Sequence, residues 1–120
     1  MERQSKNEKL LQYFIDICLI PRQTGDEEAI SQYLLDFAKA RGLQAERDAH
    51  HNVLIRKPST IPGYKGPTVI VQGHMDIVYE KSADSTHKYE DGIHVVEEDG
   101  YLKSADGTSL GADNGLAVAY

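Results

Sequence analysis

Hydrophobic positions along the first third of the chain recur at the three- and four-residue steps of amphipathic helices. This spacing predicts a first helix over about residues 5–19, which Pro21 ends. A second helix is expected to follow Thr24, because Thr24 and Glu27 have the spacing of a capping box. It is expected to end before Gly42, which can adopt the left-handed conformation of a helix C-terminus. Both helices carry one apolar stripe, so both should pack against a core.

After the second helix the hydrophobic period changes to two, as is typical of strands. Alternating residues predict a strand over 43–47 and, after a turn, another over 53–55. Residues 68–72 are apolar on both faces, which predicts a central strand of a sheet covered on both sides. A hairpin is expected around an Asp-Gly turn that joins 93–96 to 101–103. This mixture of helices and strands predicts an α/β fold.

The last apolar positions predict a helix that begins at Asp113 or Asn114 and runs on from Leu116. No helix-stopping residue follows before Tyr120. Residues 1–120 are therefore expected to be a truncated piece of a longer protein, small enough to belong to one domain.

Composition and charge exclude several classes of protein. The 120 residues contain 13 Lys and Arg against 19 Asp and Glu, a net charge of −6, so there is no basic stripe to bind nucleic acid. The apolar stretch 14–20 is too short to cross a membrane, and no signal peptide is recognisable. We therefore expect a cytoplasmic protein with neither a membrane nor a nucleic-acid partner. The single cysteine, Cys18, lies among apolar residues and is expected to be a buried thiol.

Candidate chemistry appears first at the end of the predicted central strand, in Gly73-His74-Met75-Asp76. Ligands of open α/β sheets gather beyond the carboxyl ends of the strands. Residues two apart in extended backbone point to the same side, so Asp76 can reach one nitrogen of the His74 ring while the other stays free. A carboxylate that orients a ring in this way is typical of a metal-binding histidine. The alternative is a surface histidine beside an unrelated aspartate.

A second candidate lies in residues 106–115, which place three glycines and two aspartates ahead of the last predicted helix. A carboxylate presented by such a tight loop, Asp113, can bind or bridge cations. The alternative is a polar turn in which Asp113 caps the helix.

Two other motifs in the same loop are disfavoured. Residues 107–111 have the Gly-x-Ser-x-Gly pattern of a serine-hydrolase nucleophile, but no strand leads directly into Ser109 and no helix leaves it directly. An EF-hand loop that starts at Asp106 fails because Leu110 would occupy a ligand position. The remaining histidines are expected to be structural or solvated; they are His50, His51, His87 and His94.

The two candidate segments together resemble a known family. Gly-His-Met-Asp at 73–76 and Gly-Thr-Ser-Leu-Gly-Ala-Asp-Asn-Gly at 107–115 resemble the di-zinc metallopeptidases of the aminoacyl-histidine (Xaa-His) dipeptidase, or peptidase D, type. Residues 20–28 and 48–53 extend the resemblance over nearly the whole chain. It implies that residues 1–120 are the N-terminal portion of a three-layer α/β/α catalytic domain with a mixed sheet.

The resemblance also implies roles for single residues. His74 matches the terminal ligand of one zinc ion, Asp113 the carboxylate that bridges two zinc ions, and Asp76 the catalytic-site residue that positions the His74 ring. The implied cofactor is Zn²⁺, two ions per complete site, with other divalent metals as alternatives. Two such ions polarise the scissile carbonyl and lower the pKa of a bridging water toward ~7. The implied substrate is a short peptide such as an Xaa-His dipeptide.

The sequence departs from the family pattern in two respects. His51 stands where the family usually has glycine, and a positive φ there would be tolerated less well by histidine. The general base, the remaining metal ligands and the lid domain used for dimerisation would lie beyond Tyr120. We therefore expect a homodimeric full-length enzyme and an inactive 120-residue piece.

Three alternatives stay open from the sequence. One is another amide hydrolase of the same clan, such as an aminopeptidase, tripeptidase or deacylase. Another is a serine hydrolase built on Ser109. The third is a non-catalytic binding or structural module, if the chain ends naturally where this sequence ends.

Overall fold

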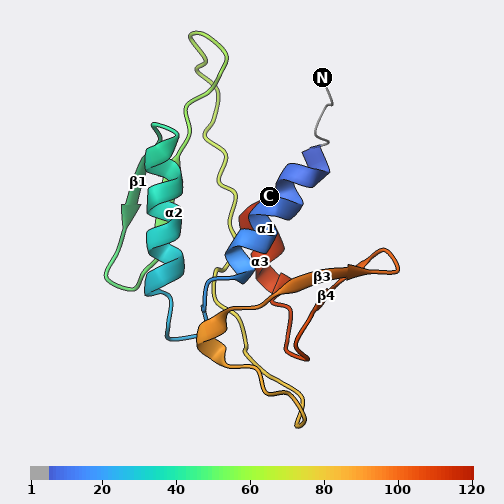
Figure 1. Ribbon diagram of the computed structural model, residues 1–120. Coiled ribbons are helices and arrows are strands. Elements are labelled where there is room, and N and C mark those ends of the chain that lie inside the picture. The colour runs from blue at the N-terminus through green and yellow to red at the C-terminus, as the bar shows by residue number, and fades with distance from the viewer. Residues whose placement is uncertain (1–5) are drawn as a thin grey trace.

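A computed structural model describes residues 6–120 and contains three α-helices, a short 3-10 helix and two small antiparallel sheets among these residues (Figure 1). The elements are, in chain order, α1 (Lys6–Cys18), α2 (Glu28–Ala40), β1 (Gln44–Arg47), β2 (Val53–Arg56), η1 (Tyr89–Asp91), β3 (Val95–Glu98), β4 (Tyr101–Ser104) and α3 (Ala112–Ala119). The two expected N-terminal helices and both expected hairpins are confirmed, and the α/β class with them.

The first hairpin pairs β1 with β2 in the register Gln44 to Arg56, and α2 packs on it. Its turn is organised by Asp48, whose Oδ1 accepts hydrogen bonds from the main-chain nitrogens of His50 and Asn52, both at 2.9 Å. The Asn52 amide also donates to Asp48, and this bond holds the pKa of Asp48 below its ordinary value. His51 has a φ of 66°, so the positive φ that disfavours histidine at this position is present.

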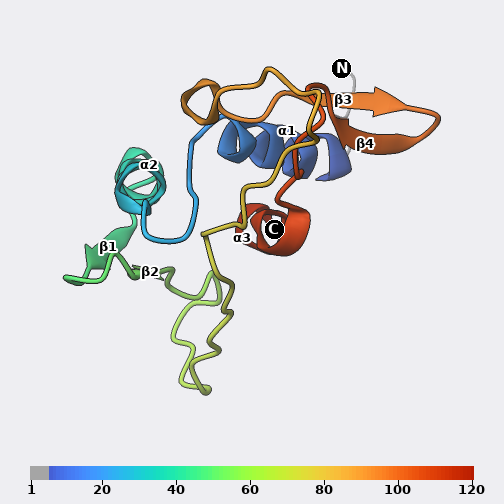
Figure 2. The same ribbon diagram turned by 90° about the horizontal axis from the view of Figure 1, so that it is seen from below.

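The helices α1 and α3 pack side by side, and the second hairpin, β3 with β4, lies along the other side of α1 (Figure 2). The side chains of α1 that face inward supply much of the core, as the stripe predicts. The buried apolar residues are Phe14, Ile17, Cys18, Ile30, Ala38, Ile77 and Ile93. The expectation that Cys18 is a buried thiol is confirmed, and burial raises its pKa.

The predicted strand over residues 68–72 is wrong. This segment has no strand pairing and forms part of an excursion that projects away from the helices (Figures 1 and 2). Val69, Ile70 and Val71 are 79%, 83% and 87% exposed. A strand exists only where a neighbour takes up its main-chain hydrogen bonds, and none of the described residues does so here. The apolar pattern was read correctly, but no sheet forms around it in this chain.

Two predicted helix starts also differ from the structure. Thr24 does not cap α2, because its hydroxyl donates to Asp76 instead, and Glu27 occupies the cap position without a side-chain cap bond. The helix α3 spans Ala112–Ala119, with Gly111 at the cap position in a left-handed conformation, φ 78°, and no side-chain cap bond. Asp113 and Asn114 have non-helical backbone, with φ/ψ of −92°/99° and −120°/27°, so regular helical backbone begins only after Asn114, although neither side chain caps it. The predicted C-terminal signal of α2 is confirmed, since Gly42 has a φ of 67°.

The molecule is flat and open, with principal extents of 57 × 43 × 23 Å. Its radius of gyration is 16.3 Å, whereas a compact domain of this length has about 13.6 Å. No helix among the described residues is long and apolar enough to cross a membrane.

Candidate active site

The structure brings His74, Asp76 and Asp113 together, and we call these three residues the His74 site. The His74 Nε2 atom lies 3.0 Å from Asp113 Oδ1, across 39 positions of sequence. On the other side of the ring, His74 Nδ1 lies 3.2 Å from Asp76 Oδ1 and 3.1 Å from the Asp76 main-chain oxygen. The expected reach of Asp76 to the ring is thus present. The second nitrogen is not free, because it faces the acid that the resemblance names as a metal ligand.

Both ring nitrogens of His74 face oxygen atoms. Carboxylate and carbonyl oxygens only accept hydrogen bonds, so these contacts favour the doubly protonated, charged form of the ring. The hydrogen bond to Asp113 raises the pKa of His74 above its ordinary value, the bonds to Asp76 act in the same direction, and partial burial opposes them. The proton on Nε2 lies between the two groups that a cation would join.

Asp76 is held in place from behind by Thr24. The Thr24 hydroxyl donates to Asp76 Oδ2 at 2.6 Å, which leaves Oδ1 for His74. This bond is the largest of the effects that hold the pKa of Asp76 below its ordinary value. Asp76 is therefore an ionised group with both oxygens engaged, and it fixes the orientation of the imidazole.

Arg22 joins the two segments that carry the site. Its side chain is fully buried, Nη1 donates to the main-chain oxygen of Met75 at 2.9 Å, and Nη2 donates to that of Gly111 at 3.0 Å. Met75 lies between His74 and Asp76, and Gly111 lies two residues before Asp113. A single guanidinium thus sets the spacing between the segment of His74 and the start of α3.

The close approach of α3 to Arg22 depends on glycine. A Cβ atom on Gly111 would lie 2.9 Å from Arg22 Nη2, and one on Gly115 would lie 2.5 Å from the same atom. Gly73 is different, since a Cβ there would make an ordinary contact of 3.4 Å with Asn114.

The His74 site opens onto a pocket of about 320 Å³ that is also lined by Thr24, Val78 and Ser109. The site residues are accessible from it, since the side chains of His74 and Asp113 are 53% and 94% exposed. A small polar ligand can therefore reach both groups.

The donor atoms suit a divalent metal ion. An imidazole nitrogen and a carboxylate oxygen are ordinary zinc ligands, and a ring whose other nitrogen is held by a carboxylate is the usual arrangement behind such a ligand. A cation at Nε2 would take the place of the ring proton and lie beside the negative charge of Asp113. The residues present therefore fit the implied metal, whose binding stays a prediction.

The alternative nucleophile, Ser109, is occupied by the main chain. Its hydroxyl donates to the Val78 oxygen at 2.9 Å and accepts from the Glu80 nitrogen at 3.2 Å. The strand β4 ends at Ser104 and α3 begins at Ala112, so the strand–serine–helix geometry of a serine hydrolase is missing from the described chain.

Sequence analysis missed two residues of the site. Arg22 and Thr24 lie in the stretch that resembles the family, yet neither was assigned a role in chemistry. The one signal in the sequence was the presence of two polar residues, Arg22 and Thr24, between the two predicted helices, and Thr24 was interpreted there as a helix cap.

Comparisons with known proteins point in one direction. No protein-family model matches the sequence. The chain is 37% identical over 116 residues to the cytosol non-specific dipeptidase of Escherichia coli (strain K12), a match that covers 97% of this chain and 24% of that protein. The crystal structure of aminoacylhistidine dipeptidase from Vibrio alginolyticus is similar with a TM-score of 0.87 and 36% identity, over 95% of this chain and 23% of that one.

The chain thus spans about a quarter of the length of either relative. Identity at this level, along with a shared fold, cannot arise from a few short motifs, and it extends over nearly all of the residues printed above. The resemblance seen in the motifs is confirmed: the chain is homologous to a quarter-length part of the dipeptidases that include the aminoacylhistidine type.

Proposed function

We propose that residues 1–120 are the N-terminal portion of the catalytic domain of a metal-dependent dipeptidase that hydrolyses short peptides of the Xaa-His type. The observation that carries this proposal is the contact between His74 Nε2 and Asp113 Oδ1, at 3.0 Å, within a chain homologous to dipeptidases. The names of the two relatives, non-specific and aminoacylhistidine dipeptidase, support a dipeptide as the substrate.

The metal would be held by His74 through Nε2 and by Asp113 through its carboxylate. Zn²⁺ is the proposed ion, two per complete site, and the Asp113 carboxylate would be one of the groups that hold them. When bound, such ions polarise the scissile carbonyl and make hydroxide available near neutral pH. The remaining ligands and the general base would come from residues outside this chain, so the chain alone is expected to be inactive.

The chain's own residues would orient the site. Asp76 fixes the ring of His74 through Nδ1, so that Nε2 faces Asp113, and Thr24 holds Asp76 in that position. Arg22 keeps the two segments at a fixed distance through Met75 and Gly111. Preorganisation of this kind removes the need to reorder ligands when substrate binds.

The wider setting is also proposed from the relatives. One relative is named as a cytosolic enzyme, which supports a cytoplasmic location. A homodimer of the full-length protein, joined through its lid domain, is part of the same proposal.

The test is dipeptide hydrolysis by the intact protein that carries this chain. Asp113→Ala is expected to lower kcat/KM at least about a thousandfold, because loss of metal stabilisation costs several kcal/mol of barrier. His50→Gln, a histidine outside the site, is the matched control and should leave activity unchanged. Chelation should abolish activity, and added Zn²⁺ should restore it.

Two results would contradict the proposal. One is full activity in excess chelator with no bound metal, and the other is unimpaired turnover by Asp113→Ala. A panel of dipeptides, tripeptides and N-acyl amino acids then separates a dipeptidase from other amide hydrolases of the clan. Efficient dipeptide cleavage by residues 1–120 alone would show that the site needs nothing further.

A further inference from the structure

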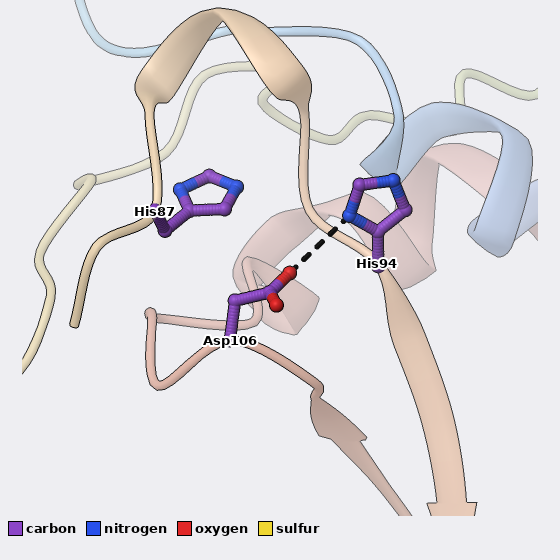
Figure 3. Close-up of side chains that lie close together, drawn as sticks. All are labelled: His87, His94 and Asp106. Atoms are coloured by element: carbon purple, nitrogen blue, oxygen red, sulfur yellow. Dashed lines mark hydrogen bonds and ion pairs between the residues drawn. The ribbon is translucent and has the colours of Figure 1, made fainter.

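A second group of possible metal ligands lies apart from the His74 site, at the base of the β3–β4 hairpin. It consists of His87, His94 and Asp106, which we call the hairpin triad (Figure 3). Each residue offers one ligand atom, and the three atoms lie within 4.8 Å of one another. Sequence analysis did not indicate this group. Its members are 7 and 12 positions apart, and both histidines were expected to be structural or solvated.

Main-chain hydrogen bonds hold the triad in place. His94 and Asp106 flank the paired strands, where the Ala105 nitrogen donates to the His94 oxygen at 2.8 Å. The loop that leads to His87 is tied to the same place, since the Ser82 nitrogen donates to the Gly107 oxygen at 2.9 Å. Main-chain hydrogen bonds of the hairpin and of the adjoining loop therefore position the three residues.

The side chains face one space. Figure 3 shows the rings of His87 and His94 and the carboxylate of Asp106 converging from three segments, with His94 Nδ1 at 3.2 Å from Asp106 Oδ2. Two ligand atoms of one tetrahedral Zn²⁺ ion with bonds of about 2.1 Å lie about 3.4 Å apart. The widest pair of the triad must therefore close by up to about 1.4 Å around an ion, which requires rotation of the side chains.

The surroundings favour a cation. The triad borders a polar pocket of about 490 Å³, which is also lined by the carboxylates of Asp84 and Asp91. No lysine or arginine is among the described residues that line it. Lys81 lies nearby, but its Nζ donates to the His87 main-chain oxygen at 2.9 Å. The three carboxylates around this pocket, those of Asp84, Asp91 and Asp106, create a negative potential that favours a cation.

The hydrogen bonds of His87 define what binding requires. Its Nε2 donates to the Gly92 oxygen at 2.6 Å, and its Nδ1 lies 2.7 Å from the Tyr79 hydroxyl, which can either donate to Nδ1 or accept from it. An ion at Nε2 would displace the bond to Gly92 and require the ring proton on Nδ1, where it would be donated to the Tyr79 oxygen. A hydrogen-bond acceptor behind the ring of a ligating histidine supports that tautomer.

We propose that His87, His94 and Asp106 form a binding site for a divalent transition-metal ion of the Zn²⁺ class, separate from the His74 site and independent of the peptidase function. Two imidazoles and one carboxylate suit Zn²⁺ and its neighbours rather than Mg²⁺ or Ca²⁺, which take oxygen ligands. Three protein ligands leave a position for water. The ion would connect the loop of His87 to the two chain segments at the base of the hairpin, the one before β3 and the one after β4.

Zn²⁺ titration of the chain with His74→Ala and Asp113→Ala tests the proposal, because this background removes the other candidate site. One ion per chain is expected to bind. His94→Gln and Asp106→Asn should each weaken binding at least about tenfold, whereas the control His50→Gln should not. Imidazole ¹⁵N spectra should show the proton of His87 move from Nε2 to Nδ1 as Zn²⁺ is added.

Absence of Zn²⁺ binding in this background would overturn the proposal, as would binding that His94→Gln leaves unchanged or a His87 ring whose tautomer does not respond. If the background chain loses its helical circular dichroism, the titration is made on the unsubstituted chain. There, His94→Gln must remove one Zn²⁺ binding event, and an unchanged number of bound ions would refute the site.

Discussion

The His74 site and the hairpin triad contain the same chemical groups, but different interactions hold them in place. The His74 site joins two distant segments, and the link between them is the buried side chain of Arg22, which donates to one main-chain oxygen in each. The hairpin triad is held by main-chain hydrogen bonds of β3, β4 and the loop beside them. One site therefore depends on a single side chain, and the other depends on the backbone.

The difference teaches where each region is vulnerable. Removal of Arg22 leaves the part-buried Met75 oxygen without its donor and takes from the Gly111 oxygen one of its two donors, since the Gly115 nitrogen also donates there at 3.1 Å. In the hairpin, main-chain bonds hold the triad instead. Substitutions around Arg22 should thus damage the His74 site first and leave the hairpin triad intact. Each prediction below tests this contrast by a change in one region with a matched control elsewhere.

The largest effect is expected for Arg22→Met. The side chains have similar length, but Met cannot donate to Met75 or Gly111. The part-buried Met75 oxygen is then left without a partner, which costs about 1–3 kcal/mol, and loss of the bond to Gly111, whose oxygen keeps the Gly115 nitrogen as donor, adds about 1 kcal/mol. The free energy of unfolding should therefore fall by about 3 kcal/mol, as measured by urea denaturation. Arg56→Met is the control, because Arg56 forms an exposed ion pair with Glu46 at 2.9 Å that contributes less than about 1 kcal/mol. An equal fall in the free energy of unfolding of the two variants would show that the bonds of Arg22 to Met75 and Gly111 do not stabilise the fold more than an exposed ion pair does.

A smaller effect is expected for Gly111→Ala, compared with Gly100→Ala. Both glycines have a positive φ, 78° and 80°, so the backbone strain is shared. Only at Gly111 would the new Cβ meet Arg22 Nη2 and Ile77 at 2.9 Å, while at Gly100 it meets nothing within 4 Å. Gly111→Ala should therefore be less stable than Gly100→Ala by about 1–3 kcal/mol, the usual cost of overpacking. Thermal unfolding of Gly111→Ala and Gly100→Ala measures this difference in stability. Equal stability of the two variants would show that a Cβ at position 111 is accommodated without strain.

Tyr89→Phe tests a bond that connects the two regions. The Tyr89 hydroxyl accepts from the Gln23 nitrogen at 2.9 Å and donates to Asp26 at 2.7 Å, so the variant should lose about 1 kcal/mol at pH 7. Burial raises the pKa of Tyr89 to about 12, and the bond to Asp26 adds to the rise. Because the folded state holds this proton more tightly, the stabilisation is complete below pH 10 and is lost as the pH rises through about 12.

Urea denaturation at pH 7, 10 and 11 checks this pH dependence. Tyr101→Phe is the control, because Tyr101 is 73% exposed. The gap between the native chain and Tyr89→Phe should narrow as the pH rises, and no such trend should appear for Tyr101→Phe. A gap that is constant across this range would rule out the raised pKa.

The smallest effect is expected for Ile70→Thr. Ile70 is 83% exposed and lies in the segment that reaches His74 without packing against other elements, so the free energy of unfolding of this chain should change by less than about 0.5 kcal/mol. Ile93→Thr, at a side chain that is only 4% exposed, should cost far more. Light scattering should also show less self-association for Ile70→Thr, because an exposed apolar segment favours contact between copies.

The sequence predicted those parts of the fold that local interactions determine. The apolar stripes of α1 and α2 and the turn between β3 and β4 are read within a few residues of chain, and each element formed as expected. The prediction of a strand over 68–72 was wrong because a strand needs a neighbouring strand to accept its main-chain hydrogen bonds. The hydrophobic pattern does not show whether that neighbour is present in the chain.

The sequence predicted the candidate site in part. Asp76 reaches His74 because residues two apart in extended backbone share a side, which is a local rule. The contact with Asp113 crosses 39 positions, and only the resemblance to dipeptidases indicated it. Arg22 could not be predicted, because its role depends on three segments that meet only in the folded chain. The hairpin triad was missed for the same reason.

The most direct test of the account is a zinc-edge anomalous difference map from crystals of the intact protein grown with Zn²⁺. The account predicts a peak within about 2.0–2.2 Å of both His74 Nε2 and an Asp113 carboxylate oxygen. A map in which those two groups still contact each other, with density for zinc elsewhere or nowhere, would contradict the proposed metallopeptidase site.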